Sequence, residues 1–170
     1  MGHTDTISHL KKREIQAPLV TAIMNAFIAE LGKEEAFRIL AGAIEKDAIK
    51  SGKELAEYYR GNSMKELASL IKEVWCMEEA MEIEILRESE SEFHFNVTKC
   101  RYAEIYRDMD EMELGKCLSC NRDFPFNKGF NPDIFLERSK TIMEGDDICD
   151  FRYSLSGGIR PFSNRANRNT

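Results

Sequence analysis

The chain has 170 residues, of which 42% are hydrophobic and 32% are charged, and this composition is typical of one globular domain with its own core. No apolar run approaches the roughly 18 residues that a membrane span needs, and the formal net charge of −6 argues against a general phosphate-binding surface. We therefore expect neither a membrane nor a nucleic-acid partner.

The N-terminal residues and the cysteines indicate the compartment. Residues 1–14 are polar and lack the charged-then-apolar pattern of a secretory signal. Five cysteines are an odd number in a chain too large to need disulfide cross-links, which favours reduced thiols. We expect a cytoplasmic protein in which some thiols are available for chemistry.

The first predicted element is a helix over residues 15–31. Apolar residues recur there at intervals of three and four and form one stripe, and Gly32 closes the helix. Pro18 leaves two alternatives open. The helix either begins with this proline in its first turn, or it kinks there and leaves residues 10–17 as a separate short helix.

Two further helices follow in the first half of the chain. A second apolar stripe predicts a helix over 34–50 that ends at Ser51-Gly52. The segment Ser63-Met64-Lys65-Glu66 has the pattern of a capping box, which opens a helix over 63–76. Trp75, at the end of that stripe, is expected in the core.

The pattern then changes to alternation with a period of two, which predicts strands. Residues 82–87 and 92–99 read as a hairpin. A second hairpin is expected from 134–143 and 148–155, with its turn at 144–147. We expect the four strands to form one antiparallel sheet, and the order of helices first and strands later predicts an α+β domain.

The segments between the two hairpins, and the sheet face that the helices cover, can also be predicted. Residues 101–119 have a helical texture, and 121–132 reads as a loop rich in Asn, Pro, Gly and Phe. The helices should cover the sheet face that carries Phe93, Phe95 and Val97, because these are the apolar members of the alternation.

The domain is expected to span residues 1–156. The segment 157–170 contains three arginines, no acidic residue and few residues that could be buried. We expect it to be a flexible basic tail that could fold back onto the acidic domain.

A Cys-x-x-Cys pair, Cys117 and Cys120, raises the alternative of a structural zinc site. Such a site needs four ligands, so His94 and Cys100 would have to complete the set. A redox role is disfavoured because the pair ends a predicted helix instead of beginning one, so no helix N-terminus lowers the thiol pKa. The predicted site contains no metal and no cofactor.

The last strand carries another cysteine beside an acidic turn. In an extended chain Cys149, Phe151 and Tyr153 share one face, while Asp150 and Arg152 share the other. Burial of Cys149 in the core, with Asp150 paired to a neighbouring cation, is one interpretation, because free cysteine is among the most buried residue types. A place for Cys149 in a functional site is the other.

Four short motifs bear on this choice: KREI at 12–15, ELG at 30–32, CNRD at 120–123 and TIMEGDDICDFR at 141–152. Together they span most of residues 10–155, and the last is the most specific of them. In this combination the chain resembles the L-2-amino-thiazoline-4-carboxylic acid hydrolase family.

This resemblance implies hydrolytic opening of a thiazoline ring to a carbamoyl-cysteine. Carbon C2 of the ring is bonded to sulfur, to the ring nitrogen and to an exocyclic amine, so it is an amidine-like electrophile. A thiolate or an activated water can attack it, and an acid must protonate the departing sulfur or nitrogen.

Candidate residues for these roles follow from the resemblance. The thiols of Cys120 and Cys149 are candidate nucleophiles, with Cys120 ranked first because it adjoins a predicted loop, and Asp123 and Asp146 are candidate acids or bases. Arg138 or Arg152 would hold the substrate carboxylate as a two-pronged donor. The candidate substrate-binding residues are Arg152, Arg138, Thr141 and His94.

Two other functions stay open. The same α+β body could be a small-molecule-binding or sensory domain that does not turn its ligand over. A protein stabilised by zinc through Cys100, Cys117, Cys120 and His94 is the third alternative. The expected partner is a small-molecule substrate, and a homodimer is also considered.

Overall fold

The structure is a computed structural model that describes residues 7–155, so the tail expected over 157–170 lies outside the described residues. The described helices are α1 (His9–Leu31), α2 (Lys33–Tyr59), α3 (Met64–Leu70), α4 (Arg101–Asp108), α5 (Met112–Leu118) and α6 (Asp123–Phe130). The described strands are β1 (Met81–Glu88), β2 (Glu92–Cys100), β3 (Ile134–Glu137) and β4 (Cys149–Leu155). A π-helical turn (Ile71–Trp75) extends α3, and 3₁₀ turns occupy Met77–Glu79, Cys120–Arg122 and Ile142–Glu144. The predicted α+β fold is confirmed.

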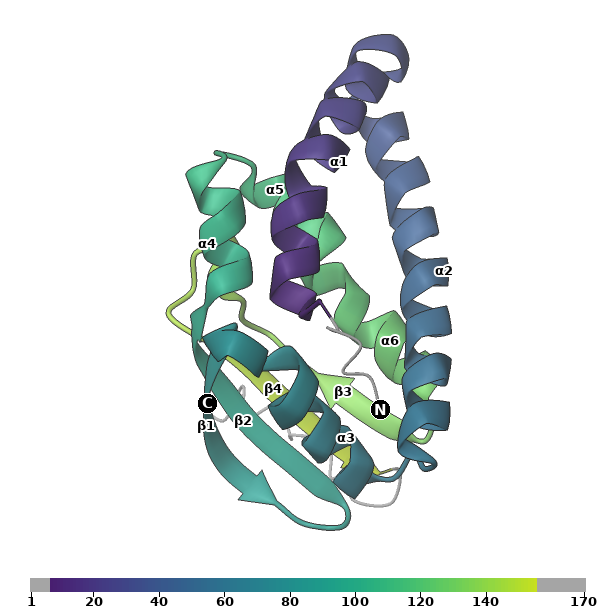
Figure 1. Ribbon diagram of the computed structural model, residues 1–170, viewed down its shortest axis with the longest axis vertical. Helices are drawn as coiled ribbons and strands as arrows, with labels where there is room; N and C mark the ends of the chain where they lie inside the picture. Colours follow the sequence, from purple (N-terminus) through teal and green to yellow (C-terminus); the bar gives the residue numbers. More distant parts are fainter. Residues whose placement is uncertain (1–6, 156–170) are drawn as a thin grey trace, which may run out of the picture.

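Helices α1 and α2 form a long antiparallel hairpin whose turn lies at the opposite end of the molecule from the β1–β2 turn (Figure 1). Gly32 makes this turn with φ +81°, in the left-handed region that favours glycine, and closes α1 as predicted. The helix runs from His9 through Pro18, so both alternatives, a start with Pro18 in the first turn and a separate helix over 10–17, are wrong. Buried Ala17 and Met24 anchor α1 on both sides of the proline, and this packing outweighs the hydrogen bond that proline cannot make.

The second helix is longer than predicted because Gly52 does not end it. Helix α2 continues to Tyr59, and at Gly52 it meets α6 so closely that a Cβ atom would overlap the Phe126 carbonyl oxygen. Gly129 of α6 approaches the backbone of Ile49 in the same way. The prediction that this helix stops at Ser51-Gly52 is therefore wrong, since this glycine serves close helix packing.

The third predicted helix is confirmed together with its cap. The Ser63 hydroxyl and the Glu66 carboxylate satisfy each other's backbone donors at the start of α3, as a capping box requires. The π-helical turn then carries the chain to Trp75, which is half-buried with its ring 5.1 Å from that of Phe126.

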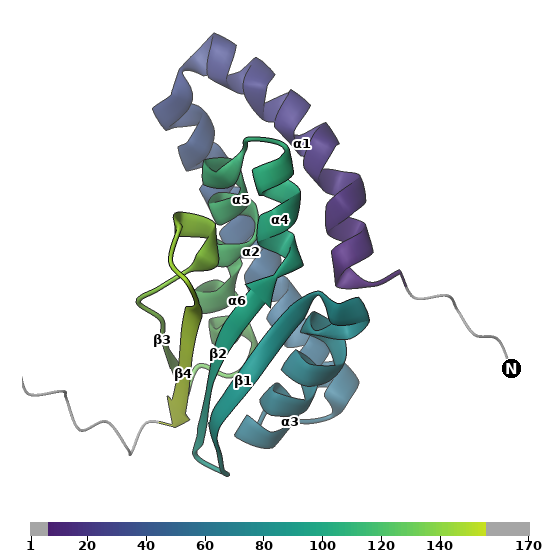
Figure 2. The ribbon, with the colours of Figure 1, turned by 90° about the vertical axis from the view of Figure 1, so that its left-hand side faces the viewer.

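The four strands form one antiparallel sheet in the order β1-β2-β4-β3, as Figure 2 shows from the side. The face that carries Phe93, Phe95 and Val97 is fully buried, which confirms the prediction that the helices cover it. Phe95 stacks on Phe151 of β4 with ring centroids 4.9 Å apart. These aromatic pairs fix the register of the two central strands.

Two predictions in the second half are wrong. The segment 121–132 contains helix α6 and not only a loop, because Phe126 and Phe130 bury one face and Pro125 lies in the first turn, where helices tolerate it. The strand predicted over 134–143 ends at Glu137. A connection over 138–148, with its own 3₁₀ turn, replaces the predicted tight turn.

The buried side chains form two clusters. One lies between the sheet, α2, α3 and α6, and the other lies among α1, α2, α4 and α5. No helix within residues 7–155 is long and apolar enough to cross a membrane.

Candidate active site

A cavity of about 550 Å³ draws its lining from both buried clusters. The first turns of α1, the C-terminal half of α2, the start of α6 and the inner face of the sheet contribute to it. Cys120, Asp123, Arg138 and Cys149, four of the predicted site residues, line this one cavity. A volume of this size is in the range that holds a small organic ligand.

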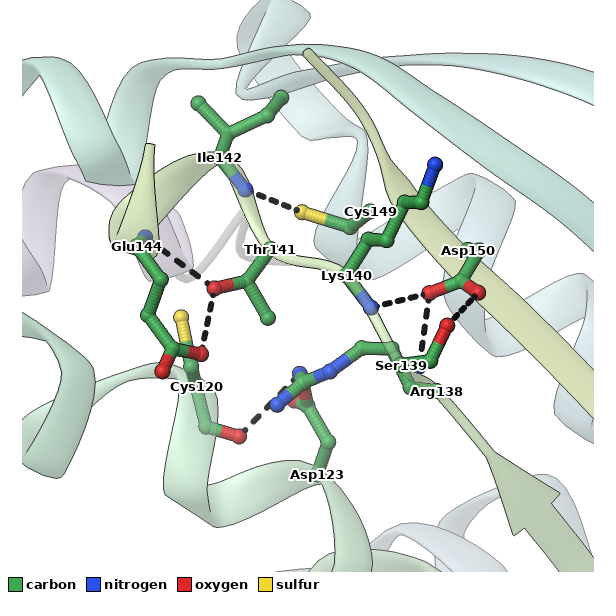
Figure 3. A network of polar contacts seen from close by, with 10 residues as sticks. All are labelled: Cys120, Asp123, Arg138, Ser139, Lys140, Thr141, Ile142, Glu144, Cys149 and Asp150. Carbon is green, nitrogen blue, oxygen red and sulfur yellow. Dashed lines mark hydrogen bonds and ion pairs between the residues drawn. The ribbon is translucent and has the colours of Figure 1, made fainter. Parts of the chain in front are cut away.

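An ion pair between Asp123 and Arg138 forms one wall of the cavity. Only 17% of the Asp123 side chain and 6% of the Arg138 side chain are exposed. Arg138 Nη1 donates to Asp123 Oδ2 and also to the Cys120 carbonyl oxygen, 3.3 Å away (Figure 3). The guanidinium carbon also lies 5.4 Å from the ring centroids of Phe124 and Phe151.

Burial changes the acidity of this carboxyl group. It raises the pKa of Asp123 to about 6, although the guanidinium groups of Arg138 and Arg122 act in the opposite direction. The group is therefore mostly ionised at neutral pH and can take up a proton with little cost. Such a carboxyl suits general acid–base chemistry.

Contacts with the first residues of β4 order the connection over 138–148, which begins at Arg138 and ends before Cys149. The Asp150 carboxylate accepts hydrogen bonds from the backbone N–H groups of Ser139 and Lys140 and from the Ser139 hydroxyl, at 2.6–2.8 Å (Figure 3). The N–H of Ile142 donates to Cys149 Sγ at 3.3 Å. The acidic motif thus orders the backbone on which two cavity residues lie.

Three thiols line the cavity, and burial keeps all of them protonated at neutral pH. Burial raises the pKa of Cys100 to about 11. It also raises the pKa of Cys120, where the negative charge of Asp123 adds to the effect, and that of Cys149, where the Ile142 N–H acts against it. A protonated thiol is a poor nucleophile.

The start of α1 brings basic side chains to the cavity. His9, Lys12, Arg13 and Gln16 lie on three successive turns of this helix, and all contribute to the lining. Arg122 is paired with Asp47 at 2.6 Å, whereas Arg13 forms no ion pair within the described part of the chain. The Nε atom of Arg13 is buried without a hydrogen-bond partner there. This guanidinium can therefore receive an anionic ligand.

The other predicted site residues do not reach the cavity lining. Two of them stabilise the 138–148 connection: Asp146 Oδ2 accepts from the Thr141 N–H at 2.9 Å, and the Thr141 hydroxyl caps the 3₁₀ turn by accepting from the Glu144 N–H. Thr141 is buried, so its side chain serves the turn.

His94 and Arg152 lie opposite each other on β2 and β4, on the sheet face that points away from Phe95 and Phe151. Arg152 donates to the carbonyl oxygens of Phe95 and Phe151 at 2.8 Å and to Asn96 Oδ1 at 2.9 Å. Its guanidinium is thus occupied with the sheet itself.

The sequence reasoning missed His9, Arg13 and Arg122. The spacing of His9, Arg13 and Gln16 at i, i+4 and i+7 is a signal that could have placed them on one helix face. The motif residues at 12–15 and 120–123 also included both arginines, but no role was assigned to them.

No group of three or more His, Cys, Asp or Glu side chains within residues 7–155 could hold a metal ion. In particular, His94 faces away from the cavity that Cys100 and Cys120 line. The zinc alternative has no ligand set in the part of the chain that the structure describes.

His9 predicts a measurable pH dependence of stability. Burial, with Lys12, Arg13 and Arg122 nearby, lowers the pKa of His9 to about 4. Between its usual value and about 4 the unfolded chain binds a proton that the folded chain does not, so stability is lost as the pH falls. Asp123, with its raised pKa, acts in the opposite direction: its contribution to stability is lost as the pH rises towards about 6.

We therefore expect the free energy of unfolding to fall less between about pH 7 and pH 4.5 in His9→Gln than in the unmodified chain. Urea denaturation at each pH measures this free energy. An unchanged or steeper loss in the variant would contradict a His9 side chain that is neutral in the folded chain at these pH values. Lys53→Gln, which removes an exposed charge that is not among those acting on His9, is the control.

Comparisons with known proteins give a family and a fold. The family model for L-2-amino-thiazoline-4-carboxylic acid hydrolase matches residues 12–153. No curated protein matches the chain.

Two solved structures are similar in fold. The phenol-responsive sensory domain of the transcription activator PoxR, solved with phenol, has a TM-score of 0.53 at 10% identity, over 88% of this chain and 76% of that one. A trafficking protein particle complex subunit 3 from Naegleria fowleri, covalently bound to palmitic acid, has a TM-score of 0.47 at 16% identity, over 87% of this chain and 99% of that one.

Proposed function

The chain belongs to the L-2-amino-thiazoline-4-carboxylic acid hydrolase family, and from this premise we propose that it hydrolyses a small cyclic amidine that carries a carboxylate. The observation that carries the proposal is the buried Asp123, with its pKa raised to about 6, on the wall of a ligand-sized cavity. The reaction takes place in that cavity.

In the proposed reaction Asp123 acts first as a base and then as an acid. Its carboxylate removes a proton from water while the water oxygen bonds to C2 of the ring. The hydroxyl proton passes to the ring nitrogen as the carbonyl forms at C2, the C2–sulfur or C2–nitrogen bond breaks, and Asp123 returns its proton to the departing atom. One water is consumed, and the product contains a carbamoyl group. Arg138 holds the carboxylate of Asp123 in one orientation throughout.

The charges and apolar groups of the cavity suit a substrate that has a carboxylate at one end and an apolar ring at the other. Arg13, which has no ion pair within the described residues, would bind the substrate carboxylate. The rings of Trp75, Phe126 and Phe151 offer an apolar wall to the heterocycle. The volume exceeds the needs of a bare five-membered ring, so substrates with an apolar substituent belong in the assay panel.

Water, and not a thiol, is the nucleophile in this proposal. Cys120 and Cys149 are protonated because burial raises the pKa of both thiols. We expect Cys120→Ala and Cys149→Ala each to keep turnover within about tenfold of the unmodified chain, and each to cost about 1–2 kcal/mol of stability by leaving a small cavity.

Steady-state kinetics measure the turnover of both variants, and thermal unfolding measures their stability. A loss of turnover of about 100-fold or more in one folded variant would assign that thiol to covalent catalysis. Cys117→Ala, which changes a buried thiol outside the cavity lining, is the matched control.

The direct test of the function is a ring-opening assay. Purified protein is mixed with the thiazoline carboxylate and with cyclic amidines that differ in ring sulfur, carboxylate and apolar substituent, and loss of the C=N absorbance is followed. Turnover that disappears when the carboxylate is removed from the substrate supports the proposal. The absence of turnover over the whole panel would overturn it.

A ligand-binding or sensory domain is the second candidate function. It is favoured by the protonation of all three cavity thiols, which leaves no activated nucleophile among them, and the PoxR sensory domain offers a precedent for the fold. Calorimetric binding of a panel member without turnover would support this candidate.

A further inference from the structure

Helix α1 exposes an apolar ridge in addition to its buried face. Leu10, Ala17 and Met24 pack inward, whereas another set of apolar side chains points to solvent. We call this set the α1 ridge; its members and exposed fractions are Ile15 60%, Leu19 64%, Ile23 45%, Phe27 44% and Leu31 49%. The stripe that predicted the helix is therefore the exposed one. Exposed apolar surface of this extent marks an interaction site.

The charges of α1 are arranged at the two ends of this ridge. Residues 15–29 contain no charged side chain. Lys12, which also borders the cavity, precedes the segment as one of the four charged residues 11–14, and Glu30 follows the segment. These two residues are about five helical turns apart and thus lie on one line along the helix. Neither forms an ion pair within residues 7–155.

Two copies of the α1 ridge match each other when the two helices run antiparallel, because apolar residues then meet apolar residues and Lys12 meets Glu30. In such a pair residues lie at the same level when their numbers have a constant sum. One register pairs Ile15, Leu19, Ile23 and Phe27 with one another, while Leu31 lies opposite the partner's Lys11. Lys12 faces the partner's Glu30, Ile15 faces the partner's Phe27, and Leu19 faces the partner's Ile23. A two-fold axis repeats each contact, as an isologous interface requires.

We propose that a second copy of this chain covers the α1 ridge, with the two α1 helices antiparallel about a two-fold axis. The apolar side chains supply the burial, and the paired charges at the ends select the antiparallel orientation. Exposed Ala22 and Ala26 beside the ridge leave room for close approach of the partner helix.

The test is the mass in solution of the full chain, measured by sedimentation equilibrium over a range of micromolar concentrations. We expect a dimer, and Leu19→Asp should raise its dissociation constant by about 30-fold or more because it places a charge at the centre of the interface. Leu86→Asp is the matched control, since Leu86 is 50% exposed on β1, away from the ridge, and should leave the dimer intact. Circular dichroism checks that both variants are folded.

Charge reversal tests the orientation separately. Glu30→Lys and Lys12→Glu should each weaken the dimer several-fold, and the double variant should restore it because the two pairs re-form with opposite signs. A dimer in which the double variant is no better than the singles would overturn the antiparallel register.

A monomer at every concentration, or a dimer that Leu86→Asp dissociates and Leu19→Asp does not, would overturn the proposal. Binding of a monomeric chain to lipid vesicles that Leu19→Asp abolishes would also overturn it and assign the ridge to a membrane surface. These outcomes are independent of the ring-opening assay.

Discussion

Asp123→Asn should lower kcat/KM for ring opening by about 100-fold to 10,000-fold, the range expected when a general base is removed. An amide cannot take the proton of the attacking water, whereas its shape and its place beside Arg138 are preserved. Steady-state kinetics on the best substrate of the panel measure the change. Calorimetric binding of the product should change much less, because binding depends on Arg13 and the apolar wall.

Asp123→Asn also lowers the stability of the fold, and a second variant separates this loss of stability from the loss of activity. Asp123→Asn leaves the buried guanidinium of Arg138 without a counter-charge, which costs about 3–5 kcal/mol when one partner of a buried ion pair is removed. The double variant Asp123→Asn/Arg138→Met removes both charges and should recover most of that stability without recovering activity. Turnover at the unmodified rate in either folded variant would exclude Asp123 as the base.

Gly52→Ala should destabilise the chain by about 3 kcal/mol or more, which is large for a single methyl group. The added Cβ would overlap the carbonyl oxygen of Phe126 and lie 2.7 Å from the Phe130 backbone nitrogen, and neither backbone atom can rotate away. Helices α2 and α6 would have to separate. Because Asp123 begins α6, activity should fall together with stability.

Gly42→Ala is the matched control in the same helix. Nothing lies within 4 Å of the position that its Cβ would occupy, so alanine should stabilise α2 by about 0.5–1 kcal/mol through its higher helix propensity. Urea denaturation of both variants makes the comparison. Equal effects at Gly42 and Gly52 would contradict the close α2–α6 contact.

The parts of the fold that the sequence predicted are those governed by local patterns. Periodicity located α1 to α3 and the β1–β2 hairpin, and Ser63 and Glu66 located a cap, because these signals arise within a few residues. Helix α6 was missed because its Pro, Asn and Gly suggest a loop. Its stability comes from tertiary packing of Phe126 and Phe130 and from the approach of Gly129 to α2.

The candidate site was predicted in part through the motifs that carry the family resemblance, and not through periodicity. Arg138, Cys149 and the pair Cys120 and Asp123 do line one cavity. Thr141 and Asp146 are instead used by the 138–148 connection for its own backbone hydrogen bonds, which spacing alone does not reveal.

The contribution of α1 could not be predicted for a different reason. Its exposed stripe is as apolar as its buried face, so periodicity could not say which side packs inward. The orientation of the helix decides that Arg13 reaches the cavity and Leu19 reaches solvent. This orientation depends on tertiary contacts with α2 and with α4, and α4 is distant in sequence.

The pH dependence of kcat/KM for ring opening tests the central claim most directly. With Asp123 as the base, activity should fall on the acidic side with a midpoint near the pKa of about 6. The acidic limb should be absent from the residual activity of Asp123→Asn. A profile that instead rises only at alkaline pH, where the raised pKa values of Cys120 and Cys149 would allow a thiolate to form, would contradict the account and assign the attack to a cysteine.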